Sequence, residues 1–201
     1  MVIYLDESYD QKHTWLLISG LFNPTHHKFY KEIKRLLITG RYILPTGDLK
    51  EIKYIYCVNS KTRRLYEKII DAFMASDSYF SSVVIKTDHT FDLQIYGAPA
   101  EPDKVKKERA YRSLAEHLLA NDLRETTNAT LFLDKMSRCE PKQFLELLKQ
   151  NFCVVNSGYS AELDRPRIKH IQDVVSSAEG YELMGVCDLL QGCILNNLVP
   201  I

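Results

Sequence analysis

The sequence has no long apolar run, no net charge and few cysteines, and each shortage narrows what the chain can be. No apolar stretch approaches the roughly 18 residues that cross a bilayer, and the chain opens on a strand pattern instead of a signal peptide, so we expect a cytoplasmic protein without membrane contacts. The 26 Lys and Arg balance the 26 Asp and Glu, so a nucleic-acid partner would have to be held by local basic clusters. The five cysteines are odd in number and show no C-x-x-C spacing, which argues against a disulfide framework and a zinc site.

What the chain does contain is the ordinary composition of a globular protein. Its 201 residues are 45% apolar and 26% charged, which suffices for a substantial buried core. This length favours a single domain over residues 1–201, carrying an insertion, and makes two independent domains a poorer fit.

Apolar runs alternate with amphipathic stretches along the chain, which predicts an α/β fold. Two of the helices would form a helical insertion at about residues 24–76, between the second and third strands, with Thr25 and Ser60 as their N-caps. The short connection after the first strand favours an antiparallel hairpin. We expect strands over residues 2–6, 14–22, 79–85, 129–134, 152–155 and 168–174, and helices over 25–39, 60–74, 104–120, 142–149 and 178–198.

Two apolar strands end in an aspartate, and these acids are the first functional signal. Asp6 ends the opening strand and Asp134 ends the strand at 129–134, so the two carboxylates would meet if the strands were neighbours. A third acid, Asp188, lies in the last helix between Gly185 and Gly192, which share its face. Because glycine is costly inside a helix, that face predicts either a close approach to Asp188 or tight packing on the sheet.

Carboxylates gathered in this way repel one another, which raises their pKa values unless cations occupy the site. Hard divalent cations prefer oxygen ligands, so Mg²⁺ or Mn²⁺ is the expected occupant. Two such ions about 4 Å apart stabilise the attacking water and the leaving oxygen in phosphodiester cleavage. The order of the elements, with acids on the first strand, a later strand and the last helix, predicts a ribonuclease H-like mixed sheet and a nuclease.

Four short motifs in this order resemble a known family. They are Asp6-Glu7-Ser8-Tyr9, Glu51-Ile52-Lys53-Tyr54, Leu131-Phe132-Leu133-Asp134, and Ser176-Ser177 followed by Met184-Gly185-Val186-Cys187-Asp188-Leu189. Along nearly its whole length the chain resembles the domain of unknown function numbered 3800, whose members show D-E-S-G, E-(L/I)-K-aromatic, an apolar strand ending in D, and S…L-Q-L-A-D-L. The resemblance implies a ribonuclease H-like fold and a metal-dependent nuclease. It assigns to the acidic site Asp6, Glu51, Asp134 and Asp188, with Lys53 and Ser177 nearby.

The chain departs from the family pattern at two positions. Tyr9 stands where glycine is typical, and Gly185 replaces the glutamine one turn before Asp188. Each departure points to an altered substrate or a lost activity.

The glutamate of the acidic site has two interpretations. The family pattern selects Glu51, in a segment (residues 48–54) whose alternation suits a short strand or an extended loop, whereas the ribonuclease H fold would place it on a helix, at Glu108 or Glu116. Around the acids we expect Glu7 and Ser8 in supporting roles, and Lys53 or Lys135 to steady the scissile phosphate.

The alternative function is a non-catalytic module that keeps the fold and binds nucleic acid or a protein. His170 could serve in proton transfer or phosphate binding, or be an ordinary strand residue. RNA and DNA are equally compatible with the pattern, and so is any oligomeric state. The residues expected to hold nucleic acid are Lys104, Lys106, Lys107, Arg109, Arg112, Arg165 and Arg167.

Overall fold

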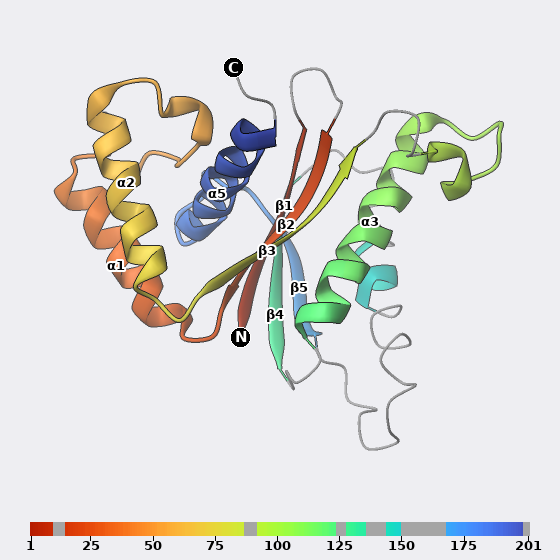
Figure 1. The fold of residues 1–201 in the computed structure, drawn as a ribbon. Coiled ribbons are helices and arrows are strands. Elements are labelled where there is room, and N and C mark those ends of the chain that lie inside the picture. Colours follow the sequence, from red (N-terminus) through yellow and green to blue (C-terminus); the bar gives the residue numbers. More distant parts are fainter. Residues whose placement is uncertain (10–14, 87–91, 124–127, 136–143, 150–167, 199–201) are drawn as a thin grey trace.

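A computed structural model describes residues 1–9, 15–86, 92–123, 128–135, 144–149 and 168–198 (Figure 1). These residues form one five-stranded mixed sheet in the order β3-β2-β1-β4-β5. The predicted strand at 152–155 and the start of the helix predicted over 142–149 lie outside the described residues, and 144–149 is helical. The strands are β1 Val2–Tyr9, β2 Trp15–Asn23, β3 Tyr79–Lys86, β4 Ala129–Asp134 and β5 Ile168–Val174.

The opening strand β1 lies in the middle of the sheet. It pairs antiparallel with β2, which confirms the predicted hairpin, and parallel with β4, so the strands that carry Asp6 and Asp134 are neighbours. The prediction that the opening strand ends at Asp6 is wrong, because β1 continues to Tyr9 in its pairing with β2. Leu5 lies opposite Leu133 in the parallel pair, so Asp6 and Asp134 follow where the pairing of β1 with β4 stops.

Helices cover both faces of the sheet. Figure 1 shows α5 (Glu182–Leu198) on one face, with α1 (His26–Thr39) and α2 (Ser60–Met74) beyond it, and α3 (Asp103–Asp122) on the other face. Both α1 and α2 follow β2 and precede β3, as predicted for the insertion, which we define as residues 24–78. Two short 3₁₀ turns complete the described elements, η1 at Tyr54–Tyr56 and η2 at Leu93–Tyr96.

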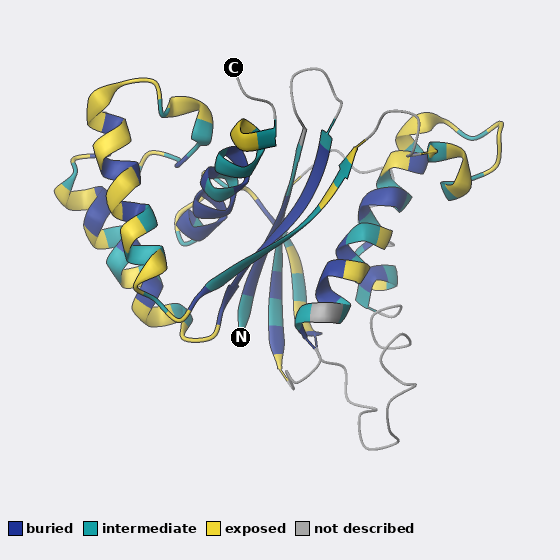
Figure 2. Ribbon diagram, viewed as in Figure 1, coloured by how far each residue is buried: buried dark blue, intermediate teal, exposed yellow. Residues whose placement is uncertain are grey.

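The alternation of side chains along β1 divides the core into two clusters. Ile3 and Leu5 pack with Leu118 of α3, whereas Tyr4 packs with Leu183 of α5 and with the insertion helices. Figure 2 shows the buried residues along the central strands and on the helix sides that face the sheet. Because successive side chains of a strand point to opposite faces, Asp6 lies on the α5 face with Tyr4.

Two local predictions are wrong, and a third holds only for the position. Thr25 is the N-cap residue of α1, as predicted, but its side chain makes no capping hydrogen bond and donates to the carboxylate of Asp77 at 2.7 Å. The cap of α2 is Asn59 instead of Ser60, because the Asn59 side chain accepts a hydrogen bond from the Thr62 N–H at 2.8 Å. The last helix begins at Glu182 and not near residue 178, because Gly180 has a φ of +93°, outside the helical range.

The sheet and its flanking helices are compatible with the predicted ribonuclease H-like α/β fold. The segment 48–54 contains no strand; it makes a single bridge, between Leu49 and Ile43, and then runs extended into η1. None of the described helices is long and apolar enough to cross a membrane.

Candidate active site

The point where the pairing of β1 with β4 stops carries the first two acids. Asp6 is 7% exposed, and its Oδ1 accepts a hydrogen bond from the Glu7 N–H at 2.9 Å. Asp134 repeats this arrangement, since its Oδ1 accepts from the Lys135 N–H at 3.0 Å. Both strands therefore present a carboxylate that is oriented by the backbone of the following residue.

The third acid joins the last helix to the insertion. Asp188 projects from α5, and its Oδ2 accepts a hydrogen bond from the Tyr54 N–H at 2.7 Å. This bond connects residues 134 positions apart and brings the motif that contains Glu51 against the helix.

The two glycines of α5 explain how the insertion comes so close. A Cβ on Gly185 would stand 2.6 Å from the Ile52 carbonyl oxygen, and one on Gly192 would overlap the ring of Tyr54. Of the two interpretations of these glycines, the close approach is correct, and the approaching group is the segment 51–54. A side chain at position 185 would clash with Ile52, whose carbonyl oxygen and Cβ occupy that space.

Tyrosines of the insertion fix this segment from the other side. The Tyr66 hydroxyl, on α2, accepts a hydrogen bond from the Lys53 N–H and donates one to the Lys53 carbonyl oxygen, both at 3.1 Å. The Tyr42 hydroxyl lies 2.9 Å from that of Tyr66, in a buried position. The insertion thus positions the backbone around Glu51.

Glu51 is placed at the site by contacts from two directions. Its Oε1 accepts a hydrogen bond from the Ser176 hydroxyl at 2.6 Å and pairs with the Lys53 ammonium at 3.3 Å. Glu108 and Glu116, the alternatives, lie on α3 across the sheet, and Glu116 pairs with Arg112 at 3.4 Å. Of the three glutamates, Glu51 is therefore the one beside the aspartates.

Burial and like charge raise the pKa of all three aspartates. For Asp6 the pKa rises well above its ordinary value, chiefly through burial and then through the charges of Glu7, Asp134 and Asp188. Burial also raises the pKa of Asp134, with Glu51 adding to the effect and hydrogen bonds from Lys135 and Ser176 opposing it.

The remaining two charges of the site respond to the same crowding. Burial raises the pKa of Asp188 against the opposing effects of the Tyr54 N–H and the Lys53 charge. Burial lowers the pKa of Lys53, but the charges of Glu51 and Asp188 outweigh it and raise that pKa overall. Among the described residues, Lys53 offsets only part of the repulsion between the carboxylates, so the site favours either protons or added cations.

The site has the type of ligand that a divalent metal ion prefers, but its side chains are not arranged as a ligand shell. Its oxygens are the ligands of hard divalent cations. However, in the part of the chain that the structure describes, no three Asp, Glu, His or Cys side chains are grouped closely enough to hold an ion. The four acids are coupled through charge, and a shift of their side chains would be needed to close a ligand shell.

The other residues expected near the acids have varied positions. Glu7 lies on the opposite side of β1 from Asp6, and Ser8 lies on the same side as Asp6, opposite Leu17 of β2. Lys135 contributes its backbone N–H, while its side chain is exposed. The serine that bonds to Glu51 is Ser176 and not the predicted Ser177.

The predicted basic cluster lies on α3, across the sheet from the acids. Lys106 is 1% exposed and donates to Gln94 Oε1 at 2.6 Å, and Arg109 pairs with Glu101 at 2.8 Å. Arg112 pairs with Glu116, so the exposed members are Lys104 and Lys107. The other two predicted residues, Arg165 and Arg167, lie outside the described residues.

His170 lies on the exposed part of β5. Its Nε2 is 3.2 Å from the side-chain oxygen of Gln172, and its ring meets Phe132 edge-on. These contacts are those of an ordinary strand residue.

The sequence did not single out two residues that support the site. Gln191, one turn after Asp188, is fully buried and donates to the Asp6 carbonyl oxygen at 2.8 Å. Tyr66 holds the Lys53 backbone. A polar residue on the apolar side of α5 was the available signal for Gln191, whereas nothing local distinguishes Tyr66 from any core tyrosine.

Neither comparison with known proteins adds to this geometry. The chain matches no protein-family model, and it has no significantly similar relative among curated proteins. Its function is therefore inferred from its own residues.

Proposed function

We propose that this chain is a divalent-metal-dependent nuclease with a ribonuclease H-like fold, acting on nucleic acid through Asp6, Glu51, Asp134 and Asp188. The observation that carries the proposal is the crowding of these four carboxylates, from β1, the insertion, β4 and α5, in which Lys53 pairs with Glu51. Such crowding raises the free energy of the folded chain and is relieved by cations.

The strand order and the parallel pairing of β1 with β4 support the fold assignment within this proposal. They bring Asp6 beside Asp134, which lies at the carboxyl end of β4, a common position for catalytic groups in α/β sheets. The flanking helices bring the other two.

Each supporting residue has a defined task. The four acids would hold Mg²⁺ or Mn²⁺, which when bound activates water and stabilises the leaving oxygen. Ser176 orients Glu51 through its hydroxyl, and Gln191 fixes the backbone of Asp6. Lys53, whose side chain is 40% exposed, is available to a phosphate oxygen once a cation displaces it from Glu51.

The test is calorimetric titration of Mg²⁺ and Mn²⁺ into the wild-type chain and Asp6→Asn, beside a cleavage assay on mixed RNA and DNA. We expect metal binding and metal-dependent cleavage in the wild type, with both reduced more than about 100-fold in Asp6→Asn, because a lost supporting contact at a metal site already costs 10- to 100-fold. Asp71→Asn, an exposed acid on α2, is the matched control and should behave as wild type.

A wild-type chain that neither binds metal nor cleaves, even with nucleic acid present, would contradict the proposal. The acids would then be structural, and the non-catalytic binding module would replace the nuclease. A nucleic-acid affinity that falls steeply with salt would identify that module.

A further inference from the structure

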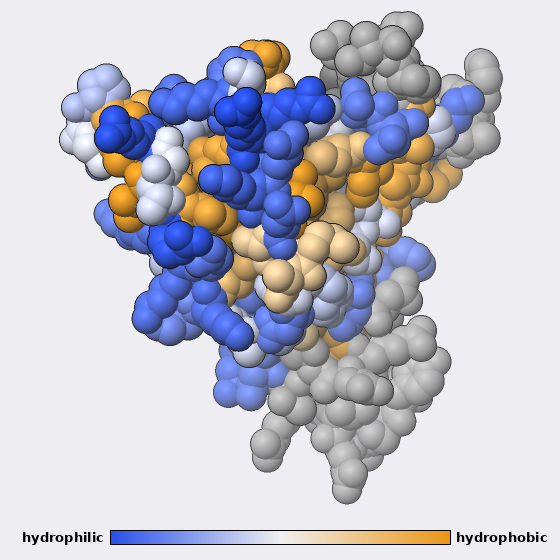
Figure 3. Space-filling view, turned by 60° about the vertical axis from the view of Figure 1, so that its left-hand side comes forward, coloured by the Kyte–Doolittle hydropathy of each residue, from blue (hydrophilic) through white to orange (hydrophobic). Residues whose placement is uncertain are grey.

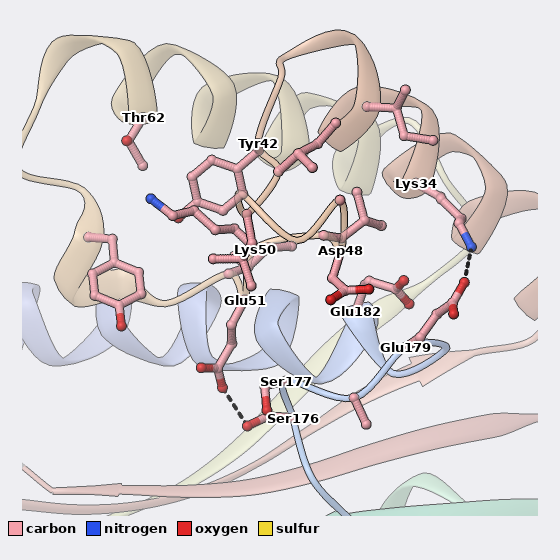
Figure 4. Close-up of a pocket in the computed structure, with 18 of the residues that line it drawn as sticks. Lys34, Tyr42, Asp48, Lys50, Glu51, Thr62, Ser176, Ser177, Glu179 and Glu182 are labelled. Carbon is pink, nitrogen blue, oxygen red and sulfur yellow. Dashed lines mark hydrogen bonds and ion pairs between the residues drawn. The ribbon is translucent and has the colours of Figure 1, made fainter.

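The insertion borders a cavity and a groove that differ in charge, and the cavity is unsuited to a phosphate backbone. The cavity has a volume of about 810 Å³ and opens between the insertion and the start of α5, next to the candidate active site (Figure 4). Among the described residues that line it, four carboxylates outnumber two lysines, so a polyanion would be repelled. The lysines are Lys34 and Lys50, and the carboxylates are Asp48, Glu51, Glu179 and Glu182.

The groove carries charge of the opposite sign. It has a volume of about 350 Å³ and lies between the end of α1 and the first half of α2. Among the described residues that line it, none is acidic and three are basic. Figure 3 shows hydrophobic side chains exposed among hydrophilic ones on the face that includes the insertion. We call the three basic residues, Lys61, Arg64 and Lys68, the groove cations.

The packing of α1 against α2 forms the apolar part of the groove. Leu36 of α1 and Leu65 of α2 line it and are 8% and 7% exposed. Gly40 follows α1, and a Cβ at this position would stand 3.0 Å from Leu65 Cδ1. The absent side chain lets the end of α1 approach Leu65, so two packed helices define the groove.

The groove cations have no ionic partner. All three are exposed, and none makes an ion pair with any described residue. One residue before Arg64, Arg63 pairs with Glu67 at 3.4 Å, whereas Arg64 is followed at the same spacing of four residues by Lys68. Like charges at this spacing destabilise a helix. Helix stability therefore does not account for the groove cations, and an anionic ligand would.

The spacing of the groove cations suits a row of phosphates. They follow one another three and four residues apart, so they lie on one side of α2 and span about 10 Å along its axis. One strand of a nucleic-acid duplex carries a phosphate about every 3.4 Å of its axis, so two or three phosphates would lie within their reach. Ser60, the first residue of α2, also lines the groove, and the positive end of the helix dipole favours an anion there.

We propose that the groove binds the phosphodiester backbone of a nucleic acid through Lys61, Arg64 and Lys68. The proposal rests on the proposed function, which makes the bound strand the substrate. Figure 1 shows α1 and α2 on the same side of the sheet as α5, which carries Asp188, so a strand in the groove lies on the side of the acids. This position favours nucleic acid over the other polyanion that such a groove could hold, an acidic protein segment.

The groove holds the strand away from the bond that is cleaved. Tyr66, which bonds to the Lys53 backbone, follows Arg64 by two residues, so the two side chains project from opposite sides of α2. The chain from Glu51 to Ser60 joins the acids to the start of the groove. The groove should therefore set the affinity for the substrate and leave the chemical step unaffected.

The experiment measures the affinity of labelled RNA and DNA oligonucleotides by fluorescence anisotropy, in EDTA, between 50 and 200 mM salt. Each alanine variant of a groove cation should reduce the slope of log affinity against log salt by about 0.7–0.9. The triple variant should reduce it by about two and bind at least about tenfold more weakly at 50 mM salt. Lys31→Ala removes one exposed lysine of α1 outside the groove and is the matched control.

Lys68→Glu separates binding from folding. It places an acid four residues after Arg64, at the spacing of the pair between Arg63 and Glu67, so it should keep the unfolding temperature of wild type. Its affinity for the oligonucleotide should fall more than that of Lys68→Ala. A loss of affinity at an unchanged unfolding temperature would show that the groove acts in binding.

Two results would overturn the inference. The first is an equal affinity and an equal salt dependence for wild type and the triple variant. The second is binding of polyglutamate without binding of the oligonucleotide, which would make the groove the docking site of an acidic protein segment.

Cleavage kinetics separate this inference from the proposed function. With Mg²⁺, the triple variant should raise KM about tenfold and leave kcat nearly unchanged, because the groove lies away from the cleaved bond. Cleavage with an unchanged KM would contradict only the groove assignment. Oligonucleotide binding that depends on the groove in a chain that does not cleave would contradict the nuclease and support the groove as the site of a non-catalytic module.

Discussion

The two faces of the sheet are built from the same strands and are used in opposite ways. On the α3 face, Ile3, Leu5 and Leu133 are fully buried among other apolar side chains. On the α5 face, the residues next to them in sequence are Tyr4, Asp6 and Asp134, which lie near charges and hydrogen-bonding groups. The alternation of a strand thus separates an apolar face from one on which the candidate site lies beside a second apolar cluster.

The difference extends to the helices. On α3, Arg109 and Arg112 pair with glutamates, and Lys106 is buried against Gln94. On α5, two glycines remove side chains to admit the segment 51–54, and Asp188 remains crowded by like charge. The α5 face therefore keeps carboxylates close to one another, whereas the charged residues named on α3 are paired with opposite charges or polar groups.

The largest expected effect is on the α3 face. Leu133→Ala should lower the free energy of unfolding by about 2–5 kcal/mol, because it removes a fully buried side chain and leaves a cavity. Urea unfolding measures the change, with Val84→Ala, at a position 39% exposed, as the control. Metal affinity of the folded fraction should be unchanged. A specific loss of metal affinity would show that the two faces are not independent.

On the α5 face we expect a substitution to raise the free energy of unfolding instead of lowering it. Asp6→Asn should raise the free energy of unfolding at neutral pH in EDTA, by about 1–3 kcal/mol, because it removes a carboxylate whose pKa burial and like charge raise. A carboxyl group whose pKa is raised by folding lowers the stability of the protein as the pH rises. The loss begins near the unfolded pKa, about 4, and is complete above the folded pKa. The advantage of Asp6→Asn should therefore be absent at pH 4 and complete above the raised pKa.

The same pair of proteins tests the role of cations. Mg²⁺ or Mn²⁺ should raise the unfolding temperature of wild type and leave that of Asp6→Asn unchanged. A variant that is less stable than wild type at neutral pH in EDTA would mean that the Asp6 carboxylate is favourably placed without a cation.

The third effect concerns the fit of the insertion on α5. Gly192→Ala should lower metal affinity about tenfold, because its Cβ would overlap Tyr54 and displace the segment that carries Glu51. Alanine otherwise favours a helix by about 1 kcal/mol over glycine, so the loss would arise from the contact. Asn196→Ala, at an exposed position of the same helix, is the control. Unchanged affinity would mean that Glu51 does not depend on this contact.

A smaller effect is expected from the tyrosine that holds Lys53. Tyr66→Phe removes the hydroxyl bonded to the Lys53 backbone and should lower the free energy of unfolding by about 1–3 kcal/mol. Cleavage should fall several-fold as Glu51 becomes less well positioned. Tyr56→Phe keeps an exposed ring and serves as the control. Equal cleavage by both variants would mean that Tyr66 stabilises the fold without positioning Glu51.

The smallest effect should come from the exposed part of α3. Lys107→Ala should leave nucleic-acid affinity and its salt dependence unchanged if the substrate lies on the α5 face. Affinity is compared between 50 and 200 mM salt, where a lost phosphate contact reduces the slope by about one. A reduced slope would place nucleic acid on α3 and favour the non-catalytic binding module.

Several parts of this architecture could be predicted because their signals are local. The apolar runs at 2–6 and 129–134 identify neighbouring strands of the sheet, and Asp134 marks the end of the second, whereas the first continues past Asp6 to Tyr9. The helices at 26–39 and 60–74 follow from the spacing of their apolar residues. The contacts of Gly185 and Gly192 could be anticipated as a close approach, but not the segment that makes it.

Other parts depend on contacts between distant residues. Ser176 and Ser177 are equivalent in sequence, and only the path of the chain turns Ser176 to Glu51. The helix start at Glu182 depends on a backbone turn at Gly180. The cavity has no sequence signal, since its walls come from the insertion and from the start of α5.

By itself, the sequence determined where most of the strands and helices lie and which acids lie on them, because hydrophobic periodicity acts over a few residues. The tertiary structure decided which carboxylates meet and which glutamate joins them. Those outcomes depend on packing and charge between segments more than 100 residues apart, as in the bond from Tyr54 to Asp188.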